Sequence, residues 1–159
     1  MPAIDGLGHV GIHTDDLMKM RDFYTRVMGL QIADENLDRG IVFLSANPAE
    51  EHHEFVLARG RDVPKGAKVV QQISFKVGSP QDIREYHERL QAENARIERF
   101  VSHGNALGLY FLDPEDNRIE VYYKTGFPVP QPHGDVLSMD DSNEDWLATA
   151  RAAIPAEQA

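Results

Sequence analysis

The 159-residue sequence contains no cysteine, which excludes disulfide bonds, thiolate nucleophiles and cysteine-ligated zinc sites. It also has no apolar run long enough to span a bilayer, and no basic segment followed by an apolar one opens it. We therefore expect a cytoplasmic protein with no membrane partner. Basic residues are few: 16 Lys and Arg against 26 Asp and Glu give a net charge of −10. Nucleic acid is an unlikely class of partner on this ground, because phosphate binding requires basic patches.

The composition that remains is that of one globular domain. Hydrophobic residues make up 42% of the chain and charged residues 26%, a usual balance for a folded chain of this length. We expect a single domain over residues 1–159.

The second half of the chain has a carboxylate at an unusual position, in the middle of a predicted strand. Residues 107–112 and 118–123 alternate as two strands, and the sequence DPEDN between them predicts a turn in which Asn117 takes the unusual backbone angles. Alternation places Glu120 in the middle of the second strand, on the same face as Arg118 and Tyr122. Because carboxylates are rarely buried without a partner, a metal ion is the candidate partner for Glu120.

Histidines gather in the first half. The strand pattern of Leu7–Thr14 places His9 and His13 on one face. A second strand begins near the pair His52 and His53, and alternation puts His53 on the face of Phe55 and Leu57. Solvated histidines on a strand face, or a half-buried polar residue at a strand end, are the alternatives to a functional interpretation; we interpret His52 as a surface residue.

The two halves repeat one pattern of strand, helix and three strands. GHVGI matches QQISF, so that His9 corresponds to Gln72, and HHEFVL matches NRIEVY. This pattern predicts an α+β fold of two tandem βαβββ modules, whose curled mixed sheets enclose a metal-centred cavity. The expected segments are module one, about residues 5–60; module two, about residues 68–125; and a tail, residues 126–159, with a short helix. Polar residues 59–68 form the expected connection.

These motifs resemble the vicinal oxygen chelate superfamily, which includes glyoxalase I, bleomycin and fosfomycin resistance proteins and type I extradiol dioxygenases. The resemblance covers about residues 7–124 and depends on GHVGIHTDDL, RDFYTRVMGL, HHEFVL and HGNALGLYFLDPEDNRIEVYY. The last motif, with His103, Tyr110 and Glu120 at the family's spacing, is most similar to the single-domain, catechol 2,3-type extradiol enzymes.

The resemblance implies a metal site formed by His9, Gln72 and Glu120. It differs from the extradiol pattern at Gln72, where those enzymes have a histidine. An amide oxygen is a weaker donor than the imidazole that first-row metals prefer, although glyoxalase-type members use glutamine at related positions. Fe(II) is the expected metal, with Mn, Ni or Zn as alternatives.

The resemblance also implies roles around the substrate, an aromatic diol that reacts with O2. His53 would act as acid and base, while Tyr110 would bind a substrate oxygen and His103 would orient the substrate or the tyrosine hydroxyl. The alternative for Tyr110 is a core aromatic residue. The family also suggests a homodimer.

Two other functions stay open on the sequence. One is a glyoxalase-like, metal-dependent isomerase or lyase that does not need O2. The other is a metal-free protein that binds or sequesters small molecules, for which the joint presence of His53 and Tyr110 would have no explanation.

Overall fold

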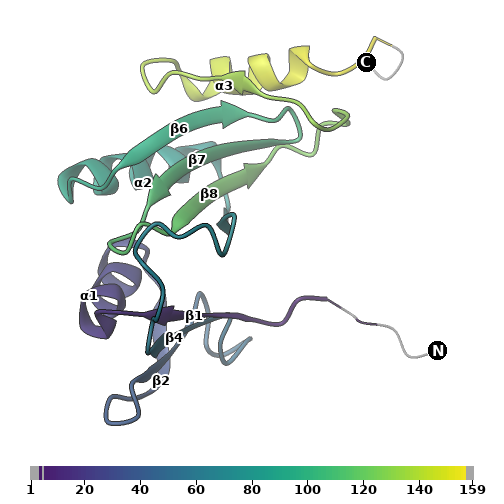
Figure 1. Cartoon of the computed structure of the whole chain (residues 1–159). Coiled ribbons are helices and arrows are strands. Elements are labelled where there is room, and N and C mark those ends of the chain that lie inside the picture. The colour runs from purple at the N-terminus through teal and green to yellow at the C-terminus, as the bar shows by residue number, and fades with distance from the viewer. Residues whose placement is uncertain (1–3, 5, 157–159) are drawn as a thin grey trace. The chain divides into compact units, whose positions relative to one another are not determined.

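A computed structural model describes residue 4 and residues 6–156 (Figure 1). The expected start of module one, residue 5, and the last three residues of the tail, 157–159, lie outside the described residues. The chain divides into two compact units, residues 1–67 and residues 68–159, and each is described here by itself.

The first unit is a four-stranded mixed sheet with one helical segment. Its strand order is β1-β4-β3-β2, in which β1 and β4 are parallel and the other pairs are antiparallel. The elements along the chain are β1 (Val10–Thr14), α1 (Leu17–Asp22), the π-helix η1 (Phe23–Val27), β2 (Gln31–Asn36), β3 (Ile41–Ser45) and β4 (Phe55–Arg59).

The helical segment of the first unit has a capped start and a buried apolar side. The Asp16 carboxylate accepts a hydrogen bond from the Lys19 N–H at 3.0 Å, which caps the start of α1. The helical segment ends before Gly29, whose φ of 77° lies in the left-handed region that glycine adopts at low cost. The apolar side chains of this segment are buried, and Tyr24 packs on Phe55 of β4 with ring centroids 4.6 Å apart.

The second unit repeats this topology and extends it. Its strand order is β5-β8-β7-β6-β9, in which β5 and β8 are parallel and the other pairs are antiparallel. The elements along the chain are β5 (Ile73–Val77), α2 (Pro80–Ala92), β6 (Ile97–Ser102), β7 (Ala106–Leu112), β8 (Arg118–Lys124), β9 (Asp135–Val136) and α3 (Asn143–Ala152). The predicted α+β class and the order of strand, helix and three strands are confirmed in each unit.

Ser79 begins α2 through a capping box. Its hydroxyl accepts from the Asp82 N–H, and the Asp82 carboxylate accepts from the Ser79 N–H. Ile83 and Leu90 are fully buried and hold the helix on one face of the sheet. The other face of this sheet is therefore the one that carries Glu120.

Some local predictions are wrong. β1 begins at Val10 rather than Leu7, and β5 begins at Ile73, the third residue of the QQISF motif. In the DPEDN turn the residue with positive φ, 62°, is Asp116 rather than Asn117. The Asn117 amide instead donates to the buried Asp113 carboxylate at 2.8 Å.

The pairing register also corrects the internal alignment. Val10 pairs with Phe55 in the first sheet and Ile73 pairs with Ile119 in the second. If His9 matches Gln72, then Val10 matches Ile73, and the residue equivalent to Glu120 is Val56. The match of HHEFVL with NRIEVY is therefore displaced by one residue.

The tail packs on the second unit. β9 adds to the edge of β6, and α3 follows it along the chain (Figure 1). Trp146 of α3 is fully buried against Phe100, with ring centroids 4.7 Å apart. Arg84 of α2 fixes the connecting segment, since its guanidinium donates to the carbonyls of Met139 and Asp141, each at 2.7 Å. Its Cζ also lies 4.2 Å from the centroid of the Trp146 ring.

Within the described residues, every helix is too short or too polar to cross a membrane.

We predict that Arg84→Ala loosens the tail. The free energy of unfolding should fall by about 2–4 kcal/mol, because hydrogen bonds from a charged donor contribute about 1.5–3 kcal/mol each. Urea unfolding measures this loss. Arg89→Ala on the same helix is the control: its ion pair with Glu85, at 3.9 Å, is exposed, and its loss should cost under about 1 kcal/mol. Equal losses for both variants would contradict the role given to Arg84.

Candidate functional site

Four side-chain positions form a row across the second sheet. Ser74 of β5 pairs with Glu120 of β8, Glu120 pairs with Tyr110 of β7, and Tyr110 pairs with Arg99 of β6. Residues paired across neighbouring strands lie on the same face of a sheet. The row therefore lies on the face opposite α2.

Glu120 is buried among neutral hydrogen-bond donors. The residue is only 7% exposed. Oε2 accepts from the Gln72 amide at 2.8 Å and from the Ser74 hydroxyl, and the Gln72 amide also donates to Ser74 Oγ at 2.9 Å. No Lys, Arg or His of the described chain lies within ion-pair distance of this carboxylate. Since a buried carboxylate needs compensation of its charge, Glu120 is a carboxylate suited to bind a cation.

Gly108 makes room for this carboxylate. A Cβ at position 108 would lie 2.5 Å from Glu120 Oε1 and 3.0 Å from Tyr110 Cε2. A side chain at this position would displace the carboxylate or the phenol ring. The absence of a side chain on Gly108 therefore forms a cradle in which Glu120 and Tyr110 lie together.

Tyr110 is the first member of a hydrogen-bonded chain that ends in the tail. Its hydroxyl lies 2.9 Å from His103 Nε2, and His103 Nδ1 lies 2.7 Å from the carbonyl oxygen of His133. A carbonyl oxygen only accepts, so the proton of His103 is on Nδ1. In the neutral imidazole, Nε2 then accepts from the Tyr110 hydroxyl. The Gln131 amide also donates to the His103 carbonyl at 2.8 Å, which ties the same loop to the tail twice.

Burial raises the pKa of Tyr110 well above its ordinary value, and the hydrogen bond and negative charge of Glu120 raise it further. The phenol is therefore a proton donor, rather than a phenolate, at neutral pH. Arg99 lies over the same ring, with its Cζ 4.4 Å from the centroid.

A cluster of rings lies at the start of β4 in the first unit. His53 lies 4.4 Å from His9 and 5.0 Å from Phe43 between ring centroids. His53 Nδ1 is 2.9 Å from His52 Nδ1, so one of the two nitrogens donates to the other. His52 is exposed and His53 is half-buried.

The predicted face of His53 is wrong. Phe55 and Leu57 are buried on the helix side of the sheet, whereas Phe43, which contacts His53, pairs with Val56 on the opposite side. His53 precedes β4, so strand alternation does not fix its direction. The correction places His53 on the face that also carries Gly11 and His13.

The predicted site residues thus form two sets. His9 and His53 are neighbours in the first unit, and Gln72, His103, Tyr110 and Glu120 are connected in the second. The sequence analysis missed Ser74, Gly108 and the carbonyl of His133. Ser74 follows Gln72 by two residues and Gly108 precedes Tyr110 by two, so strand alternation could have indicated both. Within the described residues of either unit, no three His, Asp or Glu side chains are arranged to hold a metal ion.

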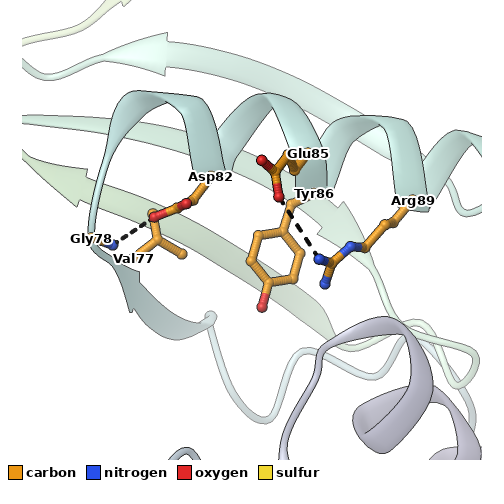
Figure 2. Close-up of a pocket in the computed structure, with 6 residues that line it drawn as sticks. All are labelled: Val77, Gly78, Asp82, Glu85, Tyr86 and Arg89. Carbon is orange, nitrogen blue, oxygen red and sulfur yellow. Dashed lines mark hydrogen bonds and ion pairs between the residues drawn. The ribbon is translucent and has the colours of Figure 1, made fainter.

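A separate pocket of about 290 Å³ lies beside the start of α2. Figure 2 shows Asp82, Glu85, Tyr86 and Arg89 along the helix, with Val77 and Gly78 before it. Asp82 is occupied by the cap of the helix, since its carboxylate also accepts from the Gly78 N–H at 3.0 Å. None of the predicted site residues lines this pocket, and α2 covers the other face of the sheet. We therefore do not assign the chemistry of Glu120 to it.

We predict a specific pH dependence of stability for the metal-free protein. Because the folded state holds the Tyr110 proton more tightly than the unfolded state, the contribution of Tyr110 to the free energy of unfolding should be constant well below pH 10, the ordinary pKa of tyrosine, and fall above it. Urea unfolding of the wild type and of Tyr110→Phe at pH 8 and at pH 10.5 measures this fall. It should be smaller in the variant. Tyr86, whose pKa burial also raises, contributes equally to both proteins, so the same slope in both would contradict the prediction.

The comparisons with known proteins agree with this fold and topology. The family model for the Glyoxalase/Bleomycin resistance protein/Dioxygenase superfamily matches residues 6–121. The chain is 27% identical over 124 residues to the manganese-dependent 2,3-dihydroxybiphenyl 1,2-dioxygenase of Geobacillus genomosp. 3, a match that covers 76% of this chain and 37% of that protein. The chain thus spans little more than a third of the length of this relative.

Two further known proteins are matched over more of their own length. The chain is 24% identical over 152 residues to biphenyl-2,3-diol 1,2-dioxygenase 3 of Rhodococcus globerulus, which covers 92% of this chain and 77% of that protein. Among solved structures, the fosfomycin resistance protein FosX of Listeria monocytogenes, in complex with Mn(II) and sulfate, matches with a TM-score of 0.63 and 18% identity, over 77% of this chain and 93% of FosX. The two βαβββ units and the family model lead to one conclusion: the chain belongs to the glyoxalase/bleomycin resistance protein/dioxygenase superfamily.

Proposed function

We propose that the protein is a metal-dependent extradiol dioxygenase that cleaves a catechol-type ring with O2. In this reaction the carbon–carbon bond next to the diol breaks. Both atoms of O2 enter the product, one in an aldehyde or ketone and one in a carboxylic acid, and the substrate supplies the electrons. The observation that carries the proposal is the buried Glu120 carboxylate, which has only neutral donors and lies beside the Tyr110–His103 pair. The similarity to two biphenyl-diol dioxygenases supports it.

The donor set fits a divalent first-row metal. We propose that His9, Gln72 and Glu120 bind it, as an imidazole nitrogen, an amide oxygen and a carboxylate. The cradle at Gly108 leaves room for the carboxylate, and Gln72, whose amide nitrogen donates to Glu120, has its carbonyl oxygen as a further donor. Fe(II) and Mn(II) are the candidate metals, and Mn(II) is named for the Geobacillus relative and for the FosX complex. When bound, such an ion would supply a common binding point for the diol and O2.

The remaining residues would move protons. His53 would accept a proton from the diol and return it as the ring opens, since an imidazole can act both as a base and as an acid. Its contact with His52 Nδ1 would hold the imidazole in one orientation. Because Tyr110 donates its only proton to His103 Nε2, its oxygen would accept a hydrogen bond from a hydroxyl of the diol. His103, oriented by the His133 carbonyl, would hold the phenol in place.

The direct test measures O2 uptake. Protein loaded anaerobically with Fe(II) or Mn(II) and then supplied with air should consume O2 with a substituted catechol and form a yellow ring-opened product. His53→Gln should lower kcat by about 100-fold or more, the usual contribution of an acid–base residue. His87→Gln is the matched control, because His87 lies on α2, and should keep wild-type turnover.

Two outcomes would contradict the proposal. Absence of turnover across a panel of catechols, with metal binding shown by elemental analysis, would exclude the dioxygenase. Metal-dependent conversion of an epoxide or a hemithioacetal without O2 uptake would instead favour the lyase or isomerase alternative.

We predict that Gln72→His tightens Fe(II) binding. Imidazole is the better donor for this ion, so the dissociation constant measured anaerobically by competition with a chelator should fall about 10- to 100-fold, the range for changes close to a metal site. Gln71→His is the control, because Gln71 is exposed and immediately precedes Gln72. An equal change in both variants, or none in Gln72→His, would exclude Gln72 as a ligand.

A further inference from the structure

Arg99 is a charged residue of the candidate site that has no acidic partner. It is exposed on β6, next to Tyr110 in the row that contains Glu120, and its Cζ lies 4.4 Å from the Tyr110 ring centroid. In the described part of the chain, no carboxylate lies within ion-pair distance of its guanidinium. This is notable in a chain of net charge −10, in which acidic side chains outnumber basic ones.

Glu98, the acidic residue next to Arg99 in the sequence, is paired with another arginine. Glu98 accepts from Arg118 Nε at 2.6 Å, and this hydrogen bond is the main cause that lowers the pKa of Glu98. Arg99 is left with one observed contact, the face of the Tyr110 ring. A guanidinium held flat on an aromatic ring keeps its N–H groups available for a carboxylate, which it binds in a bidentate manner.

The distance between Glu120 and Arg99 determines how long a ligand must be to reach both residues. Glu120 and Arg99 are both neighbours of Tyr110, on the strands at either side of β7. Two strand spacings place their Cα atoms about 10 Å apart. A catechol whose diol lies at the Glu120 end and whose ring carries a carboxylate, directly or on a short side chain, spans this distance.

We propose that the substrate is an anionic catechol, with a carboxylate on the ring or on a short side chain, and that Arg99 binds this carboxylate. The inference rests on the proposed dioxygenase function and names the substrate class of that same site. The competing explanation is that Arg99 only covers the Tyr110 ring. That role would affect neutral and anionic substrates equally.

The experiment compares matched probes that differ only in charge. 3,4-Dihydroxyphenylacetate and its carboxamide form one pair, and 3,4-dihydroxybenzoate and its carboxamide form the other. For the wild type, KM should be lower for the acid than for the amide in at least one pair. Arg99→Gln should raise KM for that acid about 10- to 100-fold more than KM for the amide, as expected for loss of a charged hydrogen bond. The control is Arg96→Gln, because Arg96 is an exposed arginine just before β6. This variant should change KM for neither the acid nor the amide.

Anaerobic calorimetry separates this inference from the proposed function. Metal-loaded protein without O2 binds the probes but does not convert them, so the affinity difference between acid and amide can be measured whether or not turnover occurs. Loss of that difference in Arg99→Gln supports the assignment. Equal weakening of both probes, or no preference for the acid in the wild type, overturns it while leaving the dioxygenase proposal standing. If the acid binds through Arg99 but no probe consumes O2, the dioxygenase proposal fails and the anion site stands.

Discussion

The Glu120 carboxylate, in a residue that is 7% exposed, has no cationic partner among the described residues, and this determines how the site is built. The parallel pairing of β5 with β8 places Ser74 directly opposite Glu120, and Gln72 reaches the same oxygen from the residue before the strand. Gly108 supplies the space that the carboxylate occupies. These neutral groups orient Glu120 but do not neutralise it. The negative charge is therefore left for a ligand, and this is the physical basis for the proposed metal.

The two units share a topology but fill it differently. The pair Ser74 and Glu120 in the second sheet corresponds by register to Gly11 and Val56 in the first. The first unit thus carries no charge at the place where the second carries its carboxylate. Its own polar groups, His9 and His53, lie outside the strands, at their N-terminal ends. The duplication has preserved the backbone while the chemistry of each copy has diverged.

The sequence predicted the order of strands and helix in each unit, because this order follows from local periodicity. It also selected Gln72, Tyr110, His103 and Glu120, which the second unit connects. It failed where periodicity does not apply. His53 precedes its strand, so alternation gave it the wrong face. Strand alternation did not place Arg99 in the site, because a bulge between Ile97 and Arg99 interrupts the alternation of β6. The acceptor at residue 133 is a main-chain carbonyl, which leaves no mark in the sequence.

That carbonyl makes the orientation of His103 insensitive to the identity of residue 133. Every amino acid provides the same oxygen, so the hydrogen bond at 2.7 Å is lost only when the backbone itself moves away. The orientation of the imidazole therefore depends on the backbone position of residue 133, not on the side chain at that residue. A change of the side chain at residue 133 leaves this hydrogen bond in place as long as the backbone path is kept, whereas an insertion or deletion there would reach the phenol of Tyr110 through two hydrogen bonds.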